Sequence, residues 1–287
     1  MTSSRVCIVL ASDSKYFHQL QASIGSIQRW SIPVACDINV IGIDLSSENL
    51  EWLKEHSVGV HTDLSVFPLF PDAPNWYAAL TGRPMLPQTF PGYEGYVWVD
   101  SDIRFLSPDG LHFFVRNSLD RTVNLAVAAE NEPAYYFSLD AGKAAFHGEF
   151  VYNRYAGSYG KETADFLRYF PVHNSGLVSA HADSPIWLRW QRNIEKTMKF
   201  GPHRLFEQEA MNVAIVEVGG IKEAPTIYNW VCPFSTPERG PNGTWVSPLE
   251  PSRKISVAHL ALSNNVCPYP GQKGTMYDFY KSIGLTA

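Results

Sequence analysis

The sequence predicts an α/β fold with a central, mostly parallel mixed sheet that is flanked by helices. Two observations carry this prediction. In the first half of the chain, apolar runs alternate with segments of helical periodicity. The apolar runs are also continuous, which is typical of parallel strands that are buried on both faces. Because the chain has no internal repeat and no obvious linker, we predict a single domain over residues 1–287.

The first five elements alternate between strand and helix. The pattern predicts a strand at 6–10, a helix with Phe17, Leu20, Ile24 and Ile27 on one face, a strand at 38–43, a helix from 46 to about 56, and a short strand at 58–61. We expect Asp13 or Ser14 to cap the first helix. Right-handed crossovers between such strands place a ligand site at their carboxyl ends.

Prolines interrupt this rhythm between residues 68 and 95, and regular elements then resume. Apolar runs predict strands at 96–99, 125–129 and 176–180. Ser184 and Pro185 begin a helix that ends at Gly201 and presents Trp187, Trp190, Ile194 and Met198 on one face. A further helix is predicted from about 206 to 217, and a last apolar run covers 255–262.

Composition excludes several classes of protein. Lys and Arg total 23 while Asp and Glu total 28, so the net charge of −5 argues against sequence-independent binding of nucleic acid. No stretch approaches the roughly 20 apolar residues of a membrane span, and the N-terminus lacks the features of a signal peptide. We therefore expect a cytoplasmic protein with reduced cysteines, since Cys7, Cys36, Cys232 and Cys267 form no C-x-x-C pair.

The strand predicted at 96–99 leads directly into Asp100-Ser101-Asp102. Two carboxylates at the end of a buried strand are costly to place there without a positively charged partner. Oxygen ligands of this kind suit Mg²⁺ or Mn²⁺ that also binds phosphate oxygens. The alternative interpretation is an ordinary acidic turn after a strand.

The run from Tyr96 to Ile103 resembles the strand and D-x-D motif of nucleotide-sugar-dependent glycosyltransferases with the GT-A fold. The order of motifs along the chain is similar to that of family 8, the retaining galactosyl- and glucosyltransferases related to glycogenin and to bacterial lipopolysaccharide galactosyltransferases. The resemblance implies a single GT-A domain. Residues 1–110 would form its nucleotide-sugar-binding half, and residues 111–287 its acceptor-binding and catalytic half.

The resemblance also implies which residues bind the donor and the metal ion. Ala11, Asp13 and Tyr16 match the motif that holds the uracil and ribose, Arg83 stands where a basic residue reaches the donor, and Ser101 lies between the two acids of the D-x-D motif. Asp100, Asp102 and the late His259 would bind the metal ion. A mixed nitrogen and oxygen ligand set favours Mn²⁺ over Mg²⁺.

The catalytic residues implied by the resemblance lie in the second half of the chain. Asn174, in an Asn-x-Gly motif, would orient sugar hydroxyls, and Tyr228-Asn229 matches a Tyr-Asn pair. Gln208, with Glu207 and Glu209 beside it, could stabilise the positive charge that develops on the sugar. The implied reaction moves a hexose from a UDP-sugar to a hydroxyl of a glycan or glycoconjugate with retention. Front-face attack and a covalent glycosyl-enzyme on a carboxylate both remain open.

Two departures from the family pattern keep other functions open. The acidic box carries Glu207 and Glu209 where the family usually has Asp, and Leu262 and Asn265 replace the Gly and Lys expected after His259. The next lysine after His259 is Lys273, fourteen residues on. Either Lys273 contacts the diphosphate by another route, as we expect, or the protein holds the phosphates less tightly. A glycosyltransferase-like protein that binds nucleotide sugars without catalysis is therefore an alternative. A D-x-D phosphohydrolase is less favoured, because its motif usually lies on the first strand.

Aromatic residues make up 13% of the chain, and six tyrosines gather in a segment, 120–171, for which the family offers no template. These are Tyr135, Tyr136, Tyr152, Tyr155, Tyr159 and Tyr169. Aromatic rings pack against the C–H faces of sugars, so this segment is interpreted as an acceptor-binding surface. A locally packed loop is the alternative.

Overall fold

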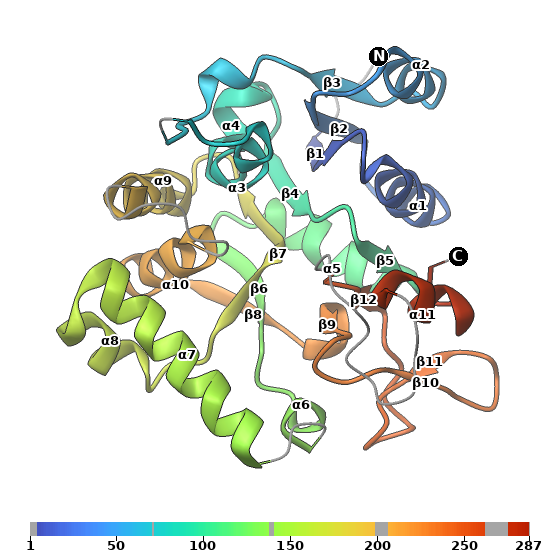
Figure 1. Cartoon of the computed structure of the whole chain (residues 1–287). Coiled ribbons are helices and arrows are strands. Elements are labelled where there is room, and N and C mark those ends of the chain that lie inside the picture. Colours follow the sequence, from blue (N-terminus) through green and yellow to red (C-terminus); the bar gives the residue numbers. More distant parts are fainter. Residues whose placement is uncertain (1–4, 71, 138–140, 199–205, 262–274, 287) are drawn as a thin grey trace.

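The computed structural model describes residues 5–70, 72–137, 141–198, 206–261 and 275–286, and the structural statements below concern these residues. Within them, a seven-stranded sheet forms the centre of the molecule, with helices on both faces (Figure 1). Its strands follow the order β3 (Gly59–His61), β2 (Cys36–Ile43), β1 (Val6–Asp13), β4 (Gly95–Val99), β7 (His173–His181), β6 (Leu125–Ala129) and β8 (Ile221–Ala224). β7 runs antiparallel to β4 and β6, whereas the other pairs are parallel. The predicted mostly parallel mixed sheet is confirmed.

Side chains that alternate along each strand supply two separate cores. Val6, Ile8 and Leu10 of β1 are fully buried against α1 (Phe17–Gln28), α2 (Ser47–Glu55) and α5 (Pro108–Ser118). Cys7 and Val9 face the other layer, which contains α3 (Ala78–Thr81), α4 (Leu86–Thr89), α9 (Pro185–Met198) and α10 (Phe206–Val218). Each large apolar side chain buried in this way contributes about 1.5–3 kcal/mol. The continuous apolar runs of the sequence follow from burial on both faces.

The first helix begins later than its predicted cap. β1 extends to Asp13, and Tyr16, not Asp13 or Ser14, occupies the N-cap position of α1 without a side-chain capping bond. The Asp13 carboxylate still accepts a hydrogen bond from the Tyr16 N–H at 2.9 Å. The strand continues because β2 pairs with it up to Ile43, opposite Asp13. Tertiary pairing thus moved the helix start by three residues, since position 16 replaces position 13 as the cap.

The proline-rich stretch folds into short helical turns. They are η1 (Leu64–Val66), η2 (Asn75–Tyr77), α3, η3 (Arg83–Met85) and α4. Pro84 and Pro87 lie in the first turn of η3 and α4, where the absence of an N–H is tolerated. This stretch packs its apolar side chains on the sheet and carries Arg83 into the interior, where 7% of the residue is exposed.

The C-terminal part adds a second, smaller sheet beside the first. β12 (Val257–His259) lies between β5 (Ile103–Phe105) and β9 (Trp230–Val231), and β10 (Glu238–Arg239) pairs with β11 (Trp245–Val246). The short helices η4 (Thr226–Tyr228) and α11 (Met276–Ser282) flank these strands. A separate apolar cluster around Trp230 and Tyr280 holds this part together. Because β5 follows the D-x-D turn, β12 lies next to that turn.

The tyrosine-rich segment forms α6 (Pro133–Phe137), α7 (Ala141–Tyr159) and α8 (Lys161–Leu167), which the sequence analysis did not predict. Its tyrosines are dispersed. Tyr135 accepts a hydrogen bond from the Val231 N–H, Tyr152 donates to Asp165, and Tyr169 is 81% exposed. Of the tyrosines whose side chains the structure describes in this segment, Tyr155 is the one that lines the cavity discussed below.

Two features of the described residues bear on disulfides and on membrane spans. Cys7, Cys36 and Cys232 form no disulfide within the described part of the chain, and Cys267 lies outside the described residues. Among the described helices, none combines the length and the apolar character needed to cross a membrane.

Candidate active site

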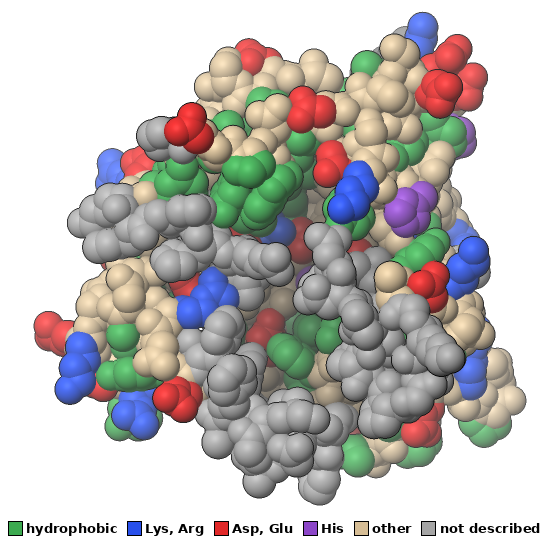
Figure 2. Space-filling model, viewed as in Figure 1, with side chains coloured by type: hydrophobic (Ala, Val, Ile, Leu, Met, Phe, Trp, Pro, Cys, Tyr) green, Lys and Arg blue, Asp and Glu red, His purple; other side chains and the backbone are tan. Residues whose placement is uncertain are grey.

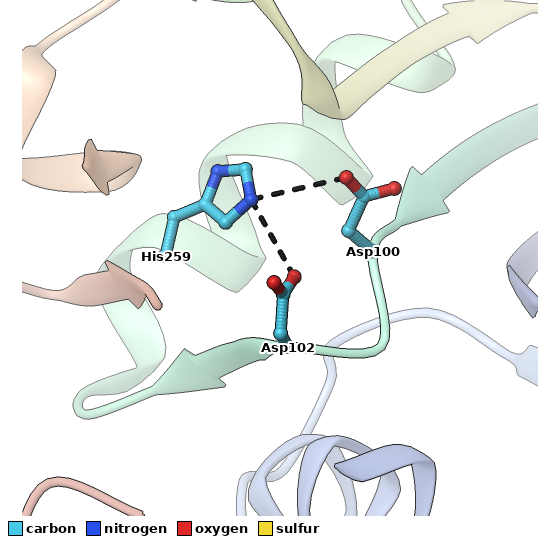
Figure 3. A group of neighbouring side chains, drawn as sticks. All are labelled: Asp100, Asp102 and His259. Carbon is cyan, nitrogen blue, oxygen red and sulfur yellow. Dashed lines mark ion pairs between the residues drawn. The ribbon is translucent and has the colours of Figure 1, made fainter. Parts of the chain in front are cut away.

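Asp100, Asp102 and His259 face one another at the carboxyl end of β4 (Figure 3). One possible ligand atom from each residue lies within 4.8 Å of the others. His259 Nε2 is 3.5 Å from Asp102 Oδ1 and 3.8 Å from Asp100 Oδ2, which is longer than an ordinary hydrogen bond. Two carboxylates and an imidazole at this spacing form a ligand set that could hold a divalent cation.

Backbone pairing explains why these three residues meet. The Asp100 N–H donates to the Gly176 carbonyl at 2.7 Å, which joins the end of β4 to β7. β5 then pairs antiparallel with β12, so that Ile103 lies opposite His259. The Leu260 N–H donates to the Asp102 carbonyl at 3.1 Å. The small sheet therefore brings a late histidine to the D-x-D turn.

Gly176 leaves the space that these side chains occupy. A Cβ atom there would lie 2.4 Å from His259 Cε1, 2.8 Å from Asp100 Oδ2 and 3.0 Å from Asn174 Oδ1. Real Cβ atoms essentially never approach other atoms closer than 3.0 Å. Any other residue at this position would displace two of the possible ligands. Lack of space for a side chain therefore explains why the Asn-x-Gly motif has a glycine here.

Arg83 is buried beside the candidate metal site and pairs with two carboxylates. It donates to Asp100 Oδ1 at 2.7 Å, to Glu207 Oε1 at 2.5 Å and to Ser175 Oγ at 2.7 Å. Trp98 Nε1 also donates to Asp100 Oδ1, at 2.7 Å. The first oxygen of Asp100 is thus held in place, while Oδ2 faces His259.

Negative charge accumulates at this point of the structure. Burial raises the pKa of Asp100, an effect that Arg83 opposes and Asp102 reinforces. Burial disfavours a charged His259, but the carboxylates of Asp102 and Asp100 outweigh this effect and raise its pKa. A divalent cation between the three side chains would relieve this repulsion, so the residues fit such an ion.

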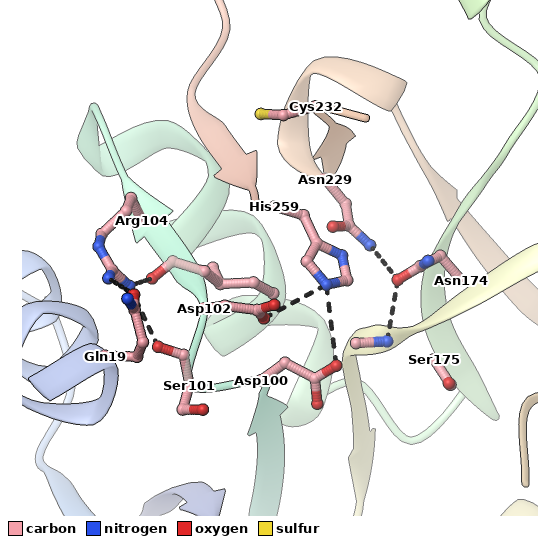
Figure 4. Close-up of polar contacts among 12 residues, drawn as sticks. Gln19, Asp100, Ser101, Asp102, Arg104, Asn174, Ser175, Asn229, Cys232 and His259 are labelled. Atoms are coloured by element: carbon pink, nitrogen blue, oxygen red, sulfur yellow. Dashed lines mark hydrogen bonds and ion pairs between the residues drawn. The ribbon is translucent and has the colours of Figure 1, made fainter. Parts of the chain in front are cut away.

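A chain of amides borders the carboxylates (Figure 4). Asn174 Oδ1 accepts hydrogen bonds from the Gly176 N–H at 2.9 Å and from Asn229 Nδ2 at 3.1 Å. Asn174 Nδ2 donates to Glu130 Oε1 at 2.8 Å. Sequence reasoning missed Glu130, although it follows a buried strand, β6, just as Asp100 follows β4. The same strand-end signal could have identified it.

The acidic box occupies the first turn of α10. Gln208 Oε1 accepts a hydrogen bond from the Ser175 N–H at 3.1 Å. Glu207 is fully buried and pairs with Arg83, whereas Glu209 forms an ion pair with Arg154 of α7. Burial raises the pKa of Glu209 to about 7, with Arg154 acting in the opposite direction. The three neighbours therefore have three different partners.

The residues expected at the nucleoside lie at the carboxyl end of β1. Ala11, Asp13 and Tyr16 line the same cavity as the metal-site carboxylates, and Ser101 does so from the D-x-D turn. Lys15 Nζ lies 5.1 Å from the centroid of the Tyr16 ring. Lys273 lies outside the described residues.

One cavity of about 870 Å³ is lined both by the residues at the end of β1 and by the candidate metal ligands. Figure 2 shows a hollow at the centre of this face, with acidic and basic side chains at its base. The predicted metal-binding, donor-binding and acidic-box residues that the structure describes all line the cavity, as does Asn174. Tyr228, Asn229 and most of the described tyrosines of the segment 120–171 are not among its lining residues. The cavity is also lined by several residues that sequence reasoning did not identify: Gln19, Trp76, Glu130, Arg154 and Phe234. Arg154 lies in the segment without a template, so the sequence carried no signal for it, whereas Tyr155 is one of the tyrosines predicted to bind the acceptor.

Arg104 supports the D-x-D turn from the side opposite the cavity's histidine (Figure 4). It donates to the carbonyls of Ser101 at 3.1 Å and Ile103 at 2.9 Å, and to Gln19 Oε1 at 2.5 Å. Burial lowers the pKa of Arg104 to about 10, so it remains cationic at neutral pH. The turn between the two carboxylates is therefore tied to helix α1.

Comparison with known proteins finds similarity in solved structures. No protein-family model matches the sequence, and no curated protein matches it. The bifunctional glycosyltransferase WbbM is 18% identical with a TM-score of 0.61, covering 99% of this chain and 50% of that chain, so this chain spans half of the WbbM length.

Two further structures match along most of both chains. The galactosyltransferase LgtC, solved with donor and acceptor sugar analogs, is 14% identical with a TM-score of 0.54, covering 88% of this chain and 86% of that chain. Mouse xyloside xylosyltransferase 1 is 12% identical with a TM-score of 0.56, and the match covers 93% of this chain and 99% of that chain. The chain therefore has the fold of these glycosyltransferases.

Proposed function

We propose that this protein is a metal-dependent glycosyltransferase that moves a hexose from a UDP-sugar to a hydroxyl of a glycan or glycoconjugate. The observation that carries the proposal is the meeting of Asp100, Asp102 and His259 inside the cavity of a chain with a glycosyltransferase fold. LgtC, which shares this fold, was solved with a donor and an acceptor sugar analog. A nucleotide sugar is therefore the first donor to test.

The metal ligands in this proposal are Asp100, Asp102 and His259, with Mn²⁺ preferred over Mg²⁺ for the mixed nitrogen and oxygen set. When bound, such an ion would neutralise the negative charge of the diphosphate leaving group. Ala11, Asp13 and Tyr16 would bind the nucleoside, because they line the cavity at the end of β1. Ser101 and Arg83 would border the phosphates, with Arg83 held between Asp100 and Glu207.

The sugar would lie between the metal site and the first turn of α10. Asn174 would orient its hydroxyls, with Gln208, Glu207 and Glu209 near the anomeric carbon, where fixed negative charge and oxygen dipoles stabilise an oxocarbenium-like transition state. We infer retention of configuration. The acceptor hydroxyl would attack from the leaving-group face and pass its proton to the departing phosphate, or a carboxylate would first form a covalent glycosyl-enzyme. NMR of the product from a single turnover reports the anomeric outcome.

The first experiment is a binding titration of UDP with Mn²⁺ or with EDTA, followed by a hydrolysis screen across UDP-hexoses. We expect tighter UDP binding with Mn²⁺ and slow hydrolysis of one UDP-hexose. Equal UDP affinity in Mn²⁺ and EDTA would remove the metal site from the proposal. UDP-sugar binding without hydrolysis or transfer across an acceptor panel would instead favour a nucleotide-sugar-binding protein that has lost catalysis.

Asp102→Asn tests the metal site with little change in shape. The amide removes the negative charge that a divalent cation needs, so we expect Mn²⁺-dependent turnover to fall about 100-fold or more, beyond the 10- to 100-fold typical of residues that only support a ligand. The matched control is Asp183→Asn, since the Asp183 side chain is 72% exposed in a surface ion pair with Arg121. Full Mn²⁺-dependent turnover by Asp102→Asn would exclude this residue as a ligand.

A further inference from the structure

Helix α7 places an arginine in the wall of the cavity, opposite the acidic box. Arg154 forms an ion pair through Nε with Glu209 of α10, and Ser158, one turn further along α7, donates to Glu209 Oε2 at 3.4 Å. Both Arg154 and Glu209 line the cavity. Their side chains are 15% and 7% exposed, so the pair is largely shielded from water.

Apolar packing holds α7 in this position. Tyr155 of α7 forms a buried cluster with Ala164 and Leu167 of α8 and Val213 of α10. Tyr159 OH donates to the Asn193 carbonyl of α9 at 3.1 Å. Because Tyr155 and Tyr159 attach α7 to α10 and α9 directly after Arg154, the guanidinium extends to Glu209 from a packed helix.

The charges around Glu209 make its protonation depend on the ion pair with Arg154. Glu207 lies in the same turn of α10, and, besides burial, the charge of Glu209 contributes to the raised pKa of Tyr155 and Tyr159 of α7. Glu207 is already paired with Arg83. Arg154 is therefore the cation that α7 provides to Glu209, and without it the pKa of this buried carboxylate beside a second carboxylate would rise further.

We propose that Arg154 is a positioning residue that holds Glu209 as an oriented carboxylate at the sugar-facing end of the cavity. The inference rests on the proposed function, in which the anomeric centre becomes positively charged during transfer. It also gives the tyrosine-rich segment a role, since α7 completes the site by neutralising a group of α10. A protonated Glu209 would offer a hydroxyl dipole in place of a negative charge and would stabilise that transition state less.

Direct binding of an anionic acceptor by Arg154 is the competing idea, and the charge of the cavity disfavours it. Among the described residues, the lining contains six acidic side chains, Asp13, Asp100, Asp102, Glu130, Glu207 and Glu209, against three Lys and Arg side chains, Lys15, Arg83 and Arg154. Glu209 already faces the guanidinium. A carboxylate or phosphate on the acceptor would have to displace this partner against the excess of negative charge.

The test compares the pH dependence of kcat in Arg154→Met, Arg154→Lys and wild type, for transfer or donor hydrolysis. Loss of an opposite charge within contact distance shifts a carboxyl pKa by about one to three units. We therefore expect the acidic limb of the profile to move up by about one to three pH units in Arg154→Met, with donor KM little changed. Arg154→Lys keeps the charge and should restore most of the wild-type profile.

Arg189→Met is the matched control, because Arg189 of α9 pairs with Glu217 on the same helix α10 at 3.6 Å but is 43% exposed. Its profile should equal that of wild type. In a Glu209→Gln background, Arg154→Met should have little further effect on kcat, since its target is absent. An additional loss there, or an unshifted profile in Arg154→Met, would overturn the inference.

A readout that needs no activity separates this inference from the proposed function. Carbon NMR of ¹³C-glutamate-labelled protein, with Glu209 assigned from Glu209→Gln, reports ionisation of that carboxylate directly. If neither transfer nor hydrolysis is found, the proposed function fails, while a higher Glu209 pKa in Arg154→Met would still support the pairing. An unchanged Glu209 pKa would refute the inference whether or not the protein is active.

Discussion

At the scale of single residues, the hydrogen bonds of Asp100 fix the orientation of its carboxylate. Its Oδ1 accepts hydrogen bonds from Arg83 and Trp98, both at 2.7 Å, while its Oδ2 faces His259. A carboxylate with one oxygen fixed by two donors has little freedom to rotate. The other oxygen is therefore presented to the candidate metal site without further loss of side-chain entropy.

Gly176→Ala tests whether the space beside these atoms matters. The new Cβ would lie 2.4 Å from His259 Cε1 and 2.8 Å from Asp100 Oδ2, so both side chains must move. We expect Mn²⁺ affinity to fall about 10- to 100-fold, as for changes that misorient metal ligands. Calorimetric titration of Mn²⁺ into the folded variant measures this effect.

The control for this variant is Gly25→Ala, in the exposed middle of α1. A Cβ at Gly25 would meet nothing within 4 Å. Alanine in a helix interior stabilises a protein by about 0.5–1 kcal/mol relative to glycine, so this variant should unfold later and bind Mn²⁺ normally. Equal Mn²⁺ affinity in both variants would contradict the steric role assigned to Gly176.

At the scale of secondary-structure elements, a serine before β12 caps a helix that is distant in sequence. Ser107, at the N-cap of α5, makes no side-chain capping bond. Ser256 Oγ instead accepts from the Gly110 N–H and from Ser107 Oγ, both at 2.8 Å. The start of α5 and the strand that carries His259 are thereby fastened together.

Ser256→Ala is expected to destabilise the protein by about 1–3 kcal/mol, because a buried helix N–H loses its acceptor. Mn²⁺ affinity should fall as well, since Ser256 lies three residues before His259. Denaturant unfolding and Mn²⁺ titration measure the two effects. Ser46→Ala is the control: Ser46 caps α2 by accepting from the Asn49 N–H at 3.3 Å, and its loss should cost about 1 kcal/mol without affecting Mn²⁺.

At the scale of the whole molecule, buried carboxylates make stability depend on pH. The pKa of Glu209 is raised from 4.5 to about 7 in the folded protein. The folded state thus binds more protons than the unfolded state between these values, and stability falls as pH rises from about 4.5 to 7. The corresponding free energy is about 3 kcal/mol at 1.36 kcal/mol per pKa unit.

Glu209→Gln removes this titration, so its free energy of unfolding should lack that part of the decrease. The comparison uses the difference between wild type and variant at pH 5 and at pH 8, because other carboxylates contribute equally to both proteins. Unfolding in urea at the two pH values provides the measurement. A difference that does not change with pH would show that Glu209 titrates near its ordinary value.

Sequence patterns predicted much of the architecture and most residues of the candidate site. Patterns of apolar residues predicted six of the seven strands of the central sheet. The clearest were the continuous runs of β1 and β4, because residues buried on both faces leave a direct trace in the sequence. The D-x-D turn after such a run predicted the location of Asp100 and Asp102, since strand ends expose side chains at one edge of the sheet. The same reasoning would have reached Glu130.

Tertiary structure decided the contacts that give these residues their properties. His259 meets the D-x-D turn through the pairing of β5 with β12, and Arg154 reaches Glu209 through packing of α7 on α10. Neither contact has a local pattern, because residues far apart in sequence are brought together by hydrophobic burial and strand pairing, not by their neighbours. The sequence by itself therefore determined which side chains could do chemistry, and the fold alone decided how each is charged, paired and aimed.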